Sequence, residues 1–498
     1  MKKLCLLITI FICTNSFAIN QNFETAKEQA VLHLENLVKI DTSYPNGKPL
    51  DAVRYIYTVL NENNIDWDIY IPTNQNKFPN QANIIAKINA TNETAEKGSE
   101  KNPKLPPLIL VTHLDTVPTK DSWSVDPFSA TKKDGYLYGL GVTDNKDLAS
   151  IFLTILTMLK PYESKLNRDI IFIATTDEEV GGNLGMQYLI DNKKLNIPPS
   201  SYALIEGGTV IKDEEGKASI VFVEASTKMY MDIKMTATGK PSHSAIAYKD
   251  HAIYKLSKAI STLENYNPPF RLNGLTKDFF EQIYPIQDDD GKTTINMLLS
   301  EDIEKAHATA NAMSMDPFFK AQLKDVITPT VITSGNEANT ISEKATATLN
   351  CRLLPDTNPE EFFQNIQNLL KDEDVSLEIA ELPTLPFPNP MSTEDELFTS
   401  IKTVSEKLMP NAIITAGMSP ASGDSEKLRR QGITTYGIGA TAIQYKNENN
   451  NGTHVADEKI NLQEFYSVLD FLYFIVEDFT LTKPKLQLQS ELGSDLTP

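Results

Sequence analysis

Cysteine and positive charge are both scarce in this sequence. Three cysteines occur in 498 residues. Two of them, Cys5 and Cys13, lie close to the N-terminus, so the rest of the chain keeps Cys351 alone and cannot form an internal disulfide. Lysine and arginine total 46 against 66 aspartates and glutamates, which gives a formal net charge of −20. This excess of negative charge argues against nucleic acid or an anionic membrane as a partner.

Long apolar runs are missing after the N-terminus, where no segment reaches the roughly 18 apolar residues of a membrane helix. The N-terminus itself, "MKKLCLLITIFICTNSFA", has Lys2 and Lys3 before a short apolar core and a small residue at Ala18. That order predicts a signal peptide over residues 1–18, with a retained anchor as the alternative. We therefore expect an exported protein, in a bacterial periplasm or secreted, with no membrane span after cleavage.

Helical and strand-like segments alternate along most of the chain. Residues 23–64 space their apolar side chains as helices do, and the strands "PLILVTHL" and "DIIFIATTDEE" flank the apolar helix "LASIFLTILTMLK". This order predicts an α/β domain with a central, mostly parallel sheet flanked by helices. Near Ser226 the pattern changes to half-exposed strands and amphipathic helices, which predicts a smaller α+β domain inserted into the first.

The expected boundaries follow these changes of pattern. The first domain is predicted over residues 19–227 and 387–480, and the inserted domain over residues 228–386. Residues from about 267 to 327 are rich in Pro, Phe and Asp and are expected to be an irregular extra insertion. The polar residues 481–498 are expected to form a disordered tail.

Histidine is also rare, with six in the chain, yet one ends the strand "PLILVTH". Asp115 follows His113 by two residues, so on a continued strand both side chains would point to the same face. A metal-binding histidine usually donates its second N–H to a carboxylate, which fixes its tautomer, and Asp115 offers such a partner. The alternative is a surface His–Asp pair at a strand end.

Acidic residues stand at several other strand ends and helix starts. Each has an ordinary explanation when taken alone: a helix cap, a solvated acidic loop or a structural histidine. Together with His113 they supply two histidines and three carboxylates for metal binding, which is the kind of set, with one bridging carboxylate, that two metal ions about 3.5–4 Å apart require. Mixed imidazole and carboxylate ligands suit Zn²⁺. These further residues are Asp144, Asp177, Glu178, Glu179, Glu206 and His454.

The order of the motifs resembles the di-zinc metallopeptidase superfamily that includes carboxypeptidase S, aminoacylase and acetylornithine deacetylase. The matching pieces are "THLDTVP", "DGYLYGLGVTDNK", "TTDEEVGG", "IEGG", "TGKPSHSA", "NEANTISEKATATLNCRLLP" and "GTHVADEKI". "IEGG" and the large insertion are most similar to the carboxypeptidase S branch. The resemblance implies a zinc-peptidase-like catalytic domain and a ferredoxin-like inserted domain that acts as a lid and in dimerisation.

The resemblance also implies a set of two zinc ions per chain. His113, Asp144 and Glu206 would hold one ion. Asp144 would bridge to the second ion, which Glu179 and His454 would also bind.

Five further residues receive roles from the same resemblance. Asp115 would orient His113, and Glu178 would be the general base. His243 of "PSHSA" would stabilise the oxyanion. Asn339 and Arg352 would contact the substrate's carbonyl or carboxylate, and the planar guanidinium of arginine suits a carboxylate.

Some residues depart from the family pattern. Leu140 stands where an arginine is usual, and Asn145 and Asp147 replace the usual neighbours of the bridging aspartate. Because the ligands themselves are kept, these changes bear on loop packing and substrate preference more than on metal binding.

The sequence thus predicts an exported zinc-dependent peptidase of the carboxypeptidase or dipeptidase type. Its substrate would be a small peptide with a free carboxylate. The resemblance implies a homodimer through the inserted domain, with a monomer as the alternative if the long insertion blocks that contact. An aminoacylase-like hydrolase of N-acyl amino acids is the first alternative. A non-catalytic binding protein on the same fold is the second, against which the intact "DEE" argues.

Overall fold

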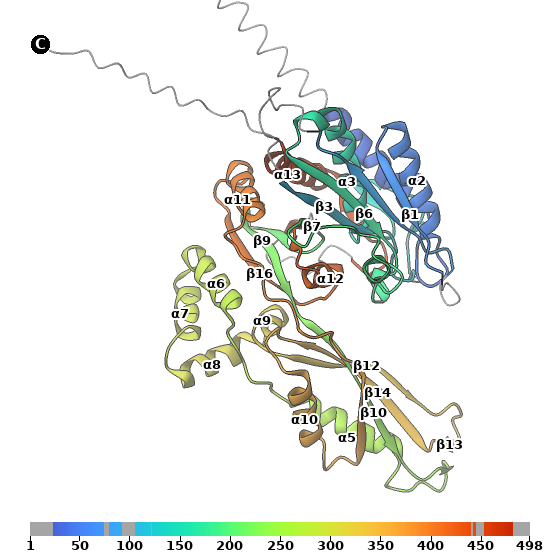
Figure 1. Ribbon diagram of the computed structural model, residues 1–498. Coiled ribbons are helices and arrows are strands. Elements are labelled where there is room, and N and C mark those ends of the chain that lie inside the picture. The colour runs from blue at the N-terminus through green and yellow to red at the C-terminus, as the bar shows by residue number, and fades with distance from the viewer. Residues whose placement is uncertain are drawn as a thin grey trace, which may run out of the picture.

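The computed structural model describes residues 23–73, 79–91, 105–120, 122–439, 442–444 and 453–481 (Figure 1). The predicted signal peptide and the predicted tail beyond residue 481 lie outside these ranges. The chain forms a larger unit around a ten-stranded sheet and a smaller unit around a four-stranded sheet (Figure 1). Within the described ranges, no helix combines the length and the apolar character needed to cross a membrane.

The central strands of the large sheet are parallel, as the sequence predicts. Strands β6, β3, β7 and β17 run parallel to one another, while β1 and β2 add antiparallel strands at one edge. The sheet order is β1 (Asp66–Tyr70), β2 (Asn83–Ile88), β6 (Arg168–Thr175), β3 (Leu105–His113), β7 (Tyr202–Ile205), β17 (Thr434–Gly437), β9 (Ala218–Thr227), β8 (Thr209–Lys212) and β18 (Ala442–Gln444), and β16 (Ile413–Ser419) pairs with β9.

Helices cover both faces of this sheet because its central strands are apolar on both faces. In β3, Leu108 and Leu110 pack into one apolar cluster, whereas Ile109 and Val111 pack into another on the opposite face. One face carries helical residues 23–38, α2 (Pro49–Glu62), α3 (Lys146–Leu159), α11 (Glu396–Leu408) and α13 (Leu462–Thr480). The other carries α4 (Met186–Asp191) and α12 (Asp424–Arg430).

The smaller unit has the βαββαβ order of a ferredoxin-like fold. Its antiparallel sheet has the order β12 (Val326–Ser334), β14 (Lys344–Leu353), β10 (Met229–Thr238) and β15 (Val375–Glu381). Every second residue of β10 is buried, from Met229 to Ala237, against α5 (Ala252–Glu264) and α10 (Pro359–Leu369). A separate two-stranded ladder of β11 (Ser242–His243) and β13 (Thr340–Ile341) stands at its far end (Figure 1).

Residues 267–327 are not irregular, as the sequence suggested, but form four short helices. These are α6 (Gly274–Ile283), α7 (Asp289–Leu298), α8 (Ile303–Met313) and α9 (Pro317–Leu323). The residues that suggested loops are N-caps: Asn273, Asp288, Asp302 and Asp316 each accept a backbone N–H of the first helical turn. The helices share an apolar cluster with β9, which contributes Ile220 and Phe222.

A small third sheet joins two segments that are distant in sequence. It pairs β4 (Thr131–Lys133), β5 (Tyr136–Tyr138) and β19 (Lys459–Asn461) in the order β19, β5, β4. The β5–β19 pairing brings the segment that carries His454 beside the loop that carries Asp144.

Candidate metal centre

The carboxyl ends of three parallel strands deliver the first part of the site. His113 is the last residue of β3, and its Cα is paired with that of Thr175, the last residue of β6. Glu178 and Glu179 follow β6 after a short turn, and Glu206 follows β7 directly. Because parallel strands end at the same edge of a sheet, these side chains converge there.

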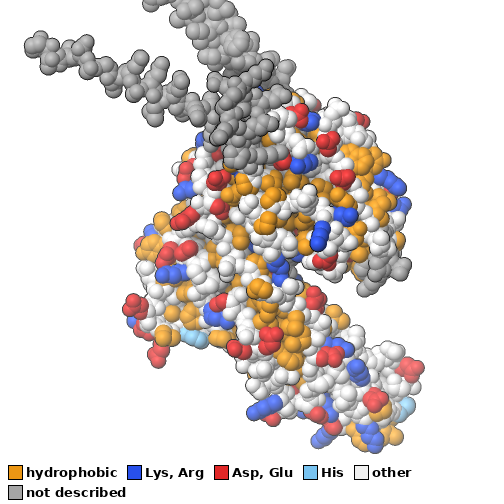
Figure 2. Space-filling model, in the orientation of Figure 1, with side chains coloured by type: hydrophobic (Ala, Val, Ile, Leu, Met, Phe, Trp, Pro, Cys, Tyr) orange, Lys and Arg blue, Asp and Glu red, His pale blue; other side chains and the backbone are white. Residues whose placement is uncertain are grey.

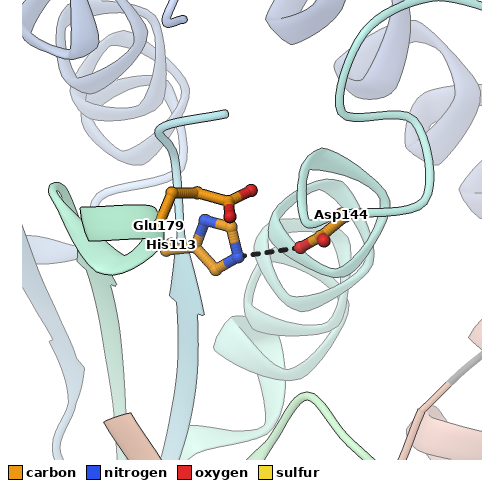
Figure 3. A group of neighbouring side chains, drawn as sticks. All are labelled: His113, Asp144 and Glu179. Atoms are coloured by element: carbon orange, nitrogen blue, oxygen red, sulfur yellow. Dashed lines mark hydrogen bonds and ion pairs between the residues drawn. The ribbon is translucent and has the colours of Figure 1, made fainter. Parts of the chain in front are cut away.

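His113 is 2% exposed and directs one ring nitrogen at two carboxylates. Its Nε2 lies 3.1 Å from Asp144 Oδ1 and 3.3 Å from Glu206 Oε2. Figure 3 shows the ring facing Asp144, with Glu179 beside it. The other nitrogen, Nδ1, donates to the backbone carbonyl of Asp115 at 2.9 Å. That bond leaves the lone pair of Nε2 for a cation between the imidazole and the acids.

His454 repeats this arrangement on the other side of Asp144. Its Nε2 lies 3.0 Å from Asp144 Oδ2 and 3.3 Å from Glu179 Oε2. Each oxygen of Asp144 therefore faces a different histidine. A carboxylate that bridges two metal ions presents its oxygens in this way.

A buried glutamate that the sequence reasoning missed holds the Asp144 loop. Glu458 is 1% exposed and accepts hydrogen bonds from the backbone N–H groups of Gly141 and Thr143 at 3.0 and 2.9 Å. It also accepts the Thr143 hydroxyl at 2.8 Å. Glu458 stands four residues after His454 in "THVADEKI", so one segment supplies both a site histidine and the support of the opposite loop.

Asp115 contacts the site differently from the sequence expectation. Strand β3 ends at His113, so the two-residue alternation does not continue to Asp115, whose carboxylate lies 3.7 Å from His113 Nδ1. This separation is longer than a hydrogen bond. The carboxylate instead accepts the backbone N–H groups of Glu178 and Glu179, each at 3.1 Å. Asp115 therefore fixes the turn that carries both glutamates, and its carbonyl fixes the histidine.

Asn145, one of the departures from the family pattern, also has a definite contact. Its amide Nδ2 donates to Glu206 Oε2 at 2.5 Å, and the Thr112 hydroxyl donates to the Asn145 side-chain oxygen at 3.0 Å. Asn145 thus orients Glu206 at the edge of the cluster.

The charges of the cluster favour a bound cation. Burial and then the Glu206 charge raise the pKa of Glu178 well above its ordinary value. Hydrogen bonds with Asp144 and Glu179 raise the pKa of His454 to about 10. Two overlapping groups, His113 with Asp144 and Glu179 and His113 with Glu178 and Glu206, each place one ligand atom per residue within 4.8 Å of the others. Nitrogen and carboxylate ligands so close together fit a site for divalent metal ions.

The structure places two of the predicted substrate residues, His243 and Asn339, far from the cluster around Asp144. His243 and Asn339 are exposed and lie together at the β11–β13 ladder, where the backbone N–H of Ser244 donates to the Asn339 carbonyl. Figure 1 shows that ladder at the end of the smaller unit, away from the large sheet. The structure does not bring His243 or Asn339 to the predicted metal ligands of the same chain.

Arg352 lies at the boundary of the two units. Its Nη1 donates to Ser422 Oγ at 2.9 Å, and its guanidinium lies 4.7 Å from the centre of the Tyr230 ring. Ser422 precedes Gly423, where a Cβ atom would come within 2.7 Å of Glu178 Oε1. The surface is indented where the two units meet (Figure 2). The segment "ASGDSEKL", which the sequence reasoning passed over, therefore borders the site.

Comparisons with known proteins agree with this geometry. The model of "Peptidase family M20/M25/M40" matches residues 109–478. The N-fatty-acyl-amino acid synthase/hydrolase PM20D1 of Xenopus tropicalis is 30% identical over 302 residues, which cover 59% of this chain and 58% of that protein. The probable carboxypeptidase S-like 2 of Dictyostelium discoideum is 27% identical over 75% of this chain and 72% of its own. Mouse aminoacylase-1 is 26% identical over 68% of this chain and 72% of its own.

Solved structures share the fold at low identity. Human carnosine dipeptidase 1 has a TM-score of 0.65 at 16% identity, covering 92% of this chain and 98% of its own. The M20 metallo-carboxypeptidase Sso-CP2 of Sulfolobus solfataricus has a TM-score of 0.63 at 17% identity, covering 90% and 98%. At these identities the likeness concerns the fold alone. With the family match over most of its length, the chain belongs to peptidase family M20/M25/M40, a family of metal-dependent amide hydrolases.

Proposed function

We propose that the protein is a two-zinc peptidase of the carboxypeptidase or dipeptidase type. The observation that carries this proposal is the position of Asp144, whose oxygens lie 3.1 Å from His113 Nε2 and 3.0 Å from His454 Nε2. Glu206 and Glu179 complete the two halves. Two zinc ions held there would polarise the scissile carbonyl and lower the pKa of a water molecule towards neutrality.

The residues of the chain divide the remaining work. Glu178 lies beside His113 and Glu206, and its raised pKa suits a group that takes a proton from water and returns it to the leaving amine. Asp115 holds Glu178 through the backbone, so the base keeps its direction while it changes protonation state. Arg352, at the boundary of the units, would bind the free carboxylate of the substrate in place of its contact with Ser422.

A substrate panel tests the peptidase assignment. Zinc-loaded protein is assayed with dipeptides, with the same dipeptides amidated at the C-terminus, and with N-acyl amino acids. We expect turnover of the free dipeptides and a large loss on amidation, because Arg352 loses its carboxylate partner. Turnover of N-acyl amino acids alone would contradict the proposal.

The aminoacylase-like alternative draws support from the names of two relatives, the Xenopus synthase/hydrolase and mouse aminoacylase-1. The same panel decides between the two substrate classes. Glu178→Gln, with zinc content measured in parallel, separates both from a non-catalytic binding protein. We expect the Glu178→Gln protein to retain zinc and to lose turnover. Glu406→Gln, which changes an exposed acid on α11, is the matched control. A Glu178→Gln protein as active as the parent would refute the role of Glu178.

His243 raises the question of assembly. It is exposed at the far end of the smaller unit, so contact with a substrate at the metal ligands needs either closure of that unit or a second copy of the chain. We propose a homodimer in which the smaller units supply this contact. Mixing Glu178→Gln with His243→Ala tests the idea, because activity would return only if the histidine acts on the other chain.

Export is likewise a proposal, tested by N-terminal sequencing for a mature start at Ile19.

A further inference from the structure

Helix α12 lies directly behind the turn that carries Glu178 and Glu179. The residue before the helix, Gly423, stands so close to Glu178 that an added Cβ would lie 2.7 Å from its Oε1. Two charged side chains of α12, Asp424 and Lys427, point back towards the same turn. None of the sequence motifs used above includes them.

Asp424 anchors this helix to the end of β6. Its side chain is 2% exposed. Oδ2 accepts the hydroxyl of Thr175, three residues before Glu178, at 3.0 Å. Oδ1 accepts Lys427 Nζ at 2.7 Å. Each oxygen of this buried carboxylate therefore has a partner.

Lys427 connects that carboxylate to the far side of the turn. Its side chain is 17% exposed, and a Cβ added to Gly182 would lie 2.3 Å from its Nζ. The ammonium group thus rests against the backbone of Gly182. Burial lowers the pKa of Lys427, but the Asp424 carboxylate raises it, and the pKa ends above its ordinary value. The side chain therefore stays charged.

The turn needs support because its backbone conformation is unusual. Asp177 has a φ of 67°, and Gly181 and Gly182 have φ of 105° and 66°. The turn closes through the Gly182 N–H, which donates to the Asp177 carbonyl at 2.5 Å. The backbone of Asp177 lies in the left-handed region that residues other than glycine rarely adopt. Surrounding contacts must therefore hold it there.

Two clamps therefore hold the Asp177–Gly182 turn from opposite ends. The Asp115 carboxylate accepts the N–H groups of Glu178 and Glu179. The ammonium of Lys427 lies against the Gly182 end and leaves no room for it to shift towards α12. We propose that Asp424 and Lys427 form a positioning pair that fixes this turn, and with it the metal ligand Glu179 and the base Glu178.

This inference rests on the roles proposed for Glu178 and Glu179, but its test does not depend on the substrate. Supporting residues behind metal ligands typically change metal affinity or activity by about 10- to 100-fold when replaced. We expect Lys427→Met to weaken zinc binding by about this factor, measured by competition with a chromophoric chelator. Lys427→Arg, which keeps the charge and the donors, should retain most of the affinity.

The double variant Asp424→Asn/Lys427→Met separates positioning from simple loss of stability. Lys427→Met alone leaves a buried carboxylate unpaired, whereas the double variant removes both charges. We expect the double variant to recover the unfolding midpoint but to keep the weakened zinc affinity. Lys402→Met, an exposed lysine on α11, is the matched control with no expected change.

Two results would overturn the proposal. One is a Lys427→Met protein that folds and binds zinc within about twofold of the parent, well inside the expected change. The other is a double variant that regains zinc affinity together with stability, because the pair would then matter only through its buried charge. Failure of the peptidase assignment would appear in the substrate panel and leave the zinc titration unaffected.

Discussion

Replacing Arg429 with methionine should destabilise the larger unit strongly. Arg429 and Glu224 form an ion pair at 3.1 Å whose side chains are 2% and 5% exposed. Arg429 also donates to the Thr435 carbonyl from Nε and Nη2, at 3.1 and 3.0 Å. The Ser425 hydroxyl donates to the same Glu224 oxygen at 2.9 Å. These bonds join α12, β9 and β17 behind the metal centre.

The expected magnitude follows from what remains after the change. Methionine fills much of the same volume but leaves the Glu224 carboxylate buried and without its cation. Removing one partner of a buried ion pair typically costs about 3–5 kcal/mol. That is a large share of the roughly 5–15 kcal/mol by which native domains are stable.

The pH dependence gives a second signature. Burial raises the pKa of Glu224 above its ordinary value even beside Arg429, and loss of the cation should raise it further. A raised carboxyl pKa means that the folded state binds the proton more tightly than the unfolded state. Its contribution to stability is present at low pH and is lost as pH rises through the folded-state pKa. The loss of stability in Arg429→Met should therefore be smaller at about pH 5 than at about pH 8.

Urea unfolding followed by tryptophan fluorescence measures this change. Both tryptophans, Trp67 and Trp123, lie outside the four-stranded sheet, in β1 and in the segment before β4 of the larger unit. Arg54→Met removes an exposed pair with Asp51 and should cost at most about 1 kcal/mol. The reasoning fails if Arg429→Met matches Arg54→Met, or if its deficit grows as the pH falls.

Three further changes test other parts of the structure. Asp115→Asn should lower kcat about 10- to 100-fold, because the amide has one acceptor oxygen where the carboxylate uses two to accept the N–H groups of Glu178 and Glu179. Unchanged kcat with normal zinc content would contradict this. Removing metal by chelation should abolish turnover and lower the unfolding midpoint, and zinc at about 100 times its Kd should restore about 2.7 kcal/mol. Phe280→Ala in the insertion should destabilise by about 3–5 kcal/mol and speed limited proteolysis there, because the ring is fully buried.

Much of the fold could be predicted because its signals are local. The strands and the helix that build the core of the larger unit have periodic or continuous apolar patterns, and β3 and α3 lie where those patterns place them. The four-helix insertion was misjudged because Asp288 and Asp302 suggest loops when read without their helices. As N-caps, the same residues mark where helices begin.

The candidate site likewise has some features that the sequence could predict and others that it could not. The convergence of His113 and Glu206 follows from strand ends, a rule that the sequence can express. The bonds of Asp115 could not be foreseen, because they depend on where β3 stops and on how the chain turns afterwards. Glu458 and Lys427 act through the backbone of other segments, and such contacts leave no periodic trace in the sequence. The distance of His243 from the predicted metal ligands depends on the arrangement of two units, which motif order does not describe.

The shared core of the insertion has a consequence for the order in which the protein assembles. Helix α6 packs against β16, and the insertion completes its apolar cluster with Phe222 of β9. Strand β9 precedes the insertion during synthesis, whereas β16 is made long after it. Residues 267–327 therefore cannot reach their final packing at the time when they are synthesised. The contact between α6 and β16 can form only after β16 has been synthesised, so the final docking of these helices is a late step of folding.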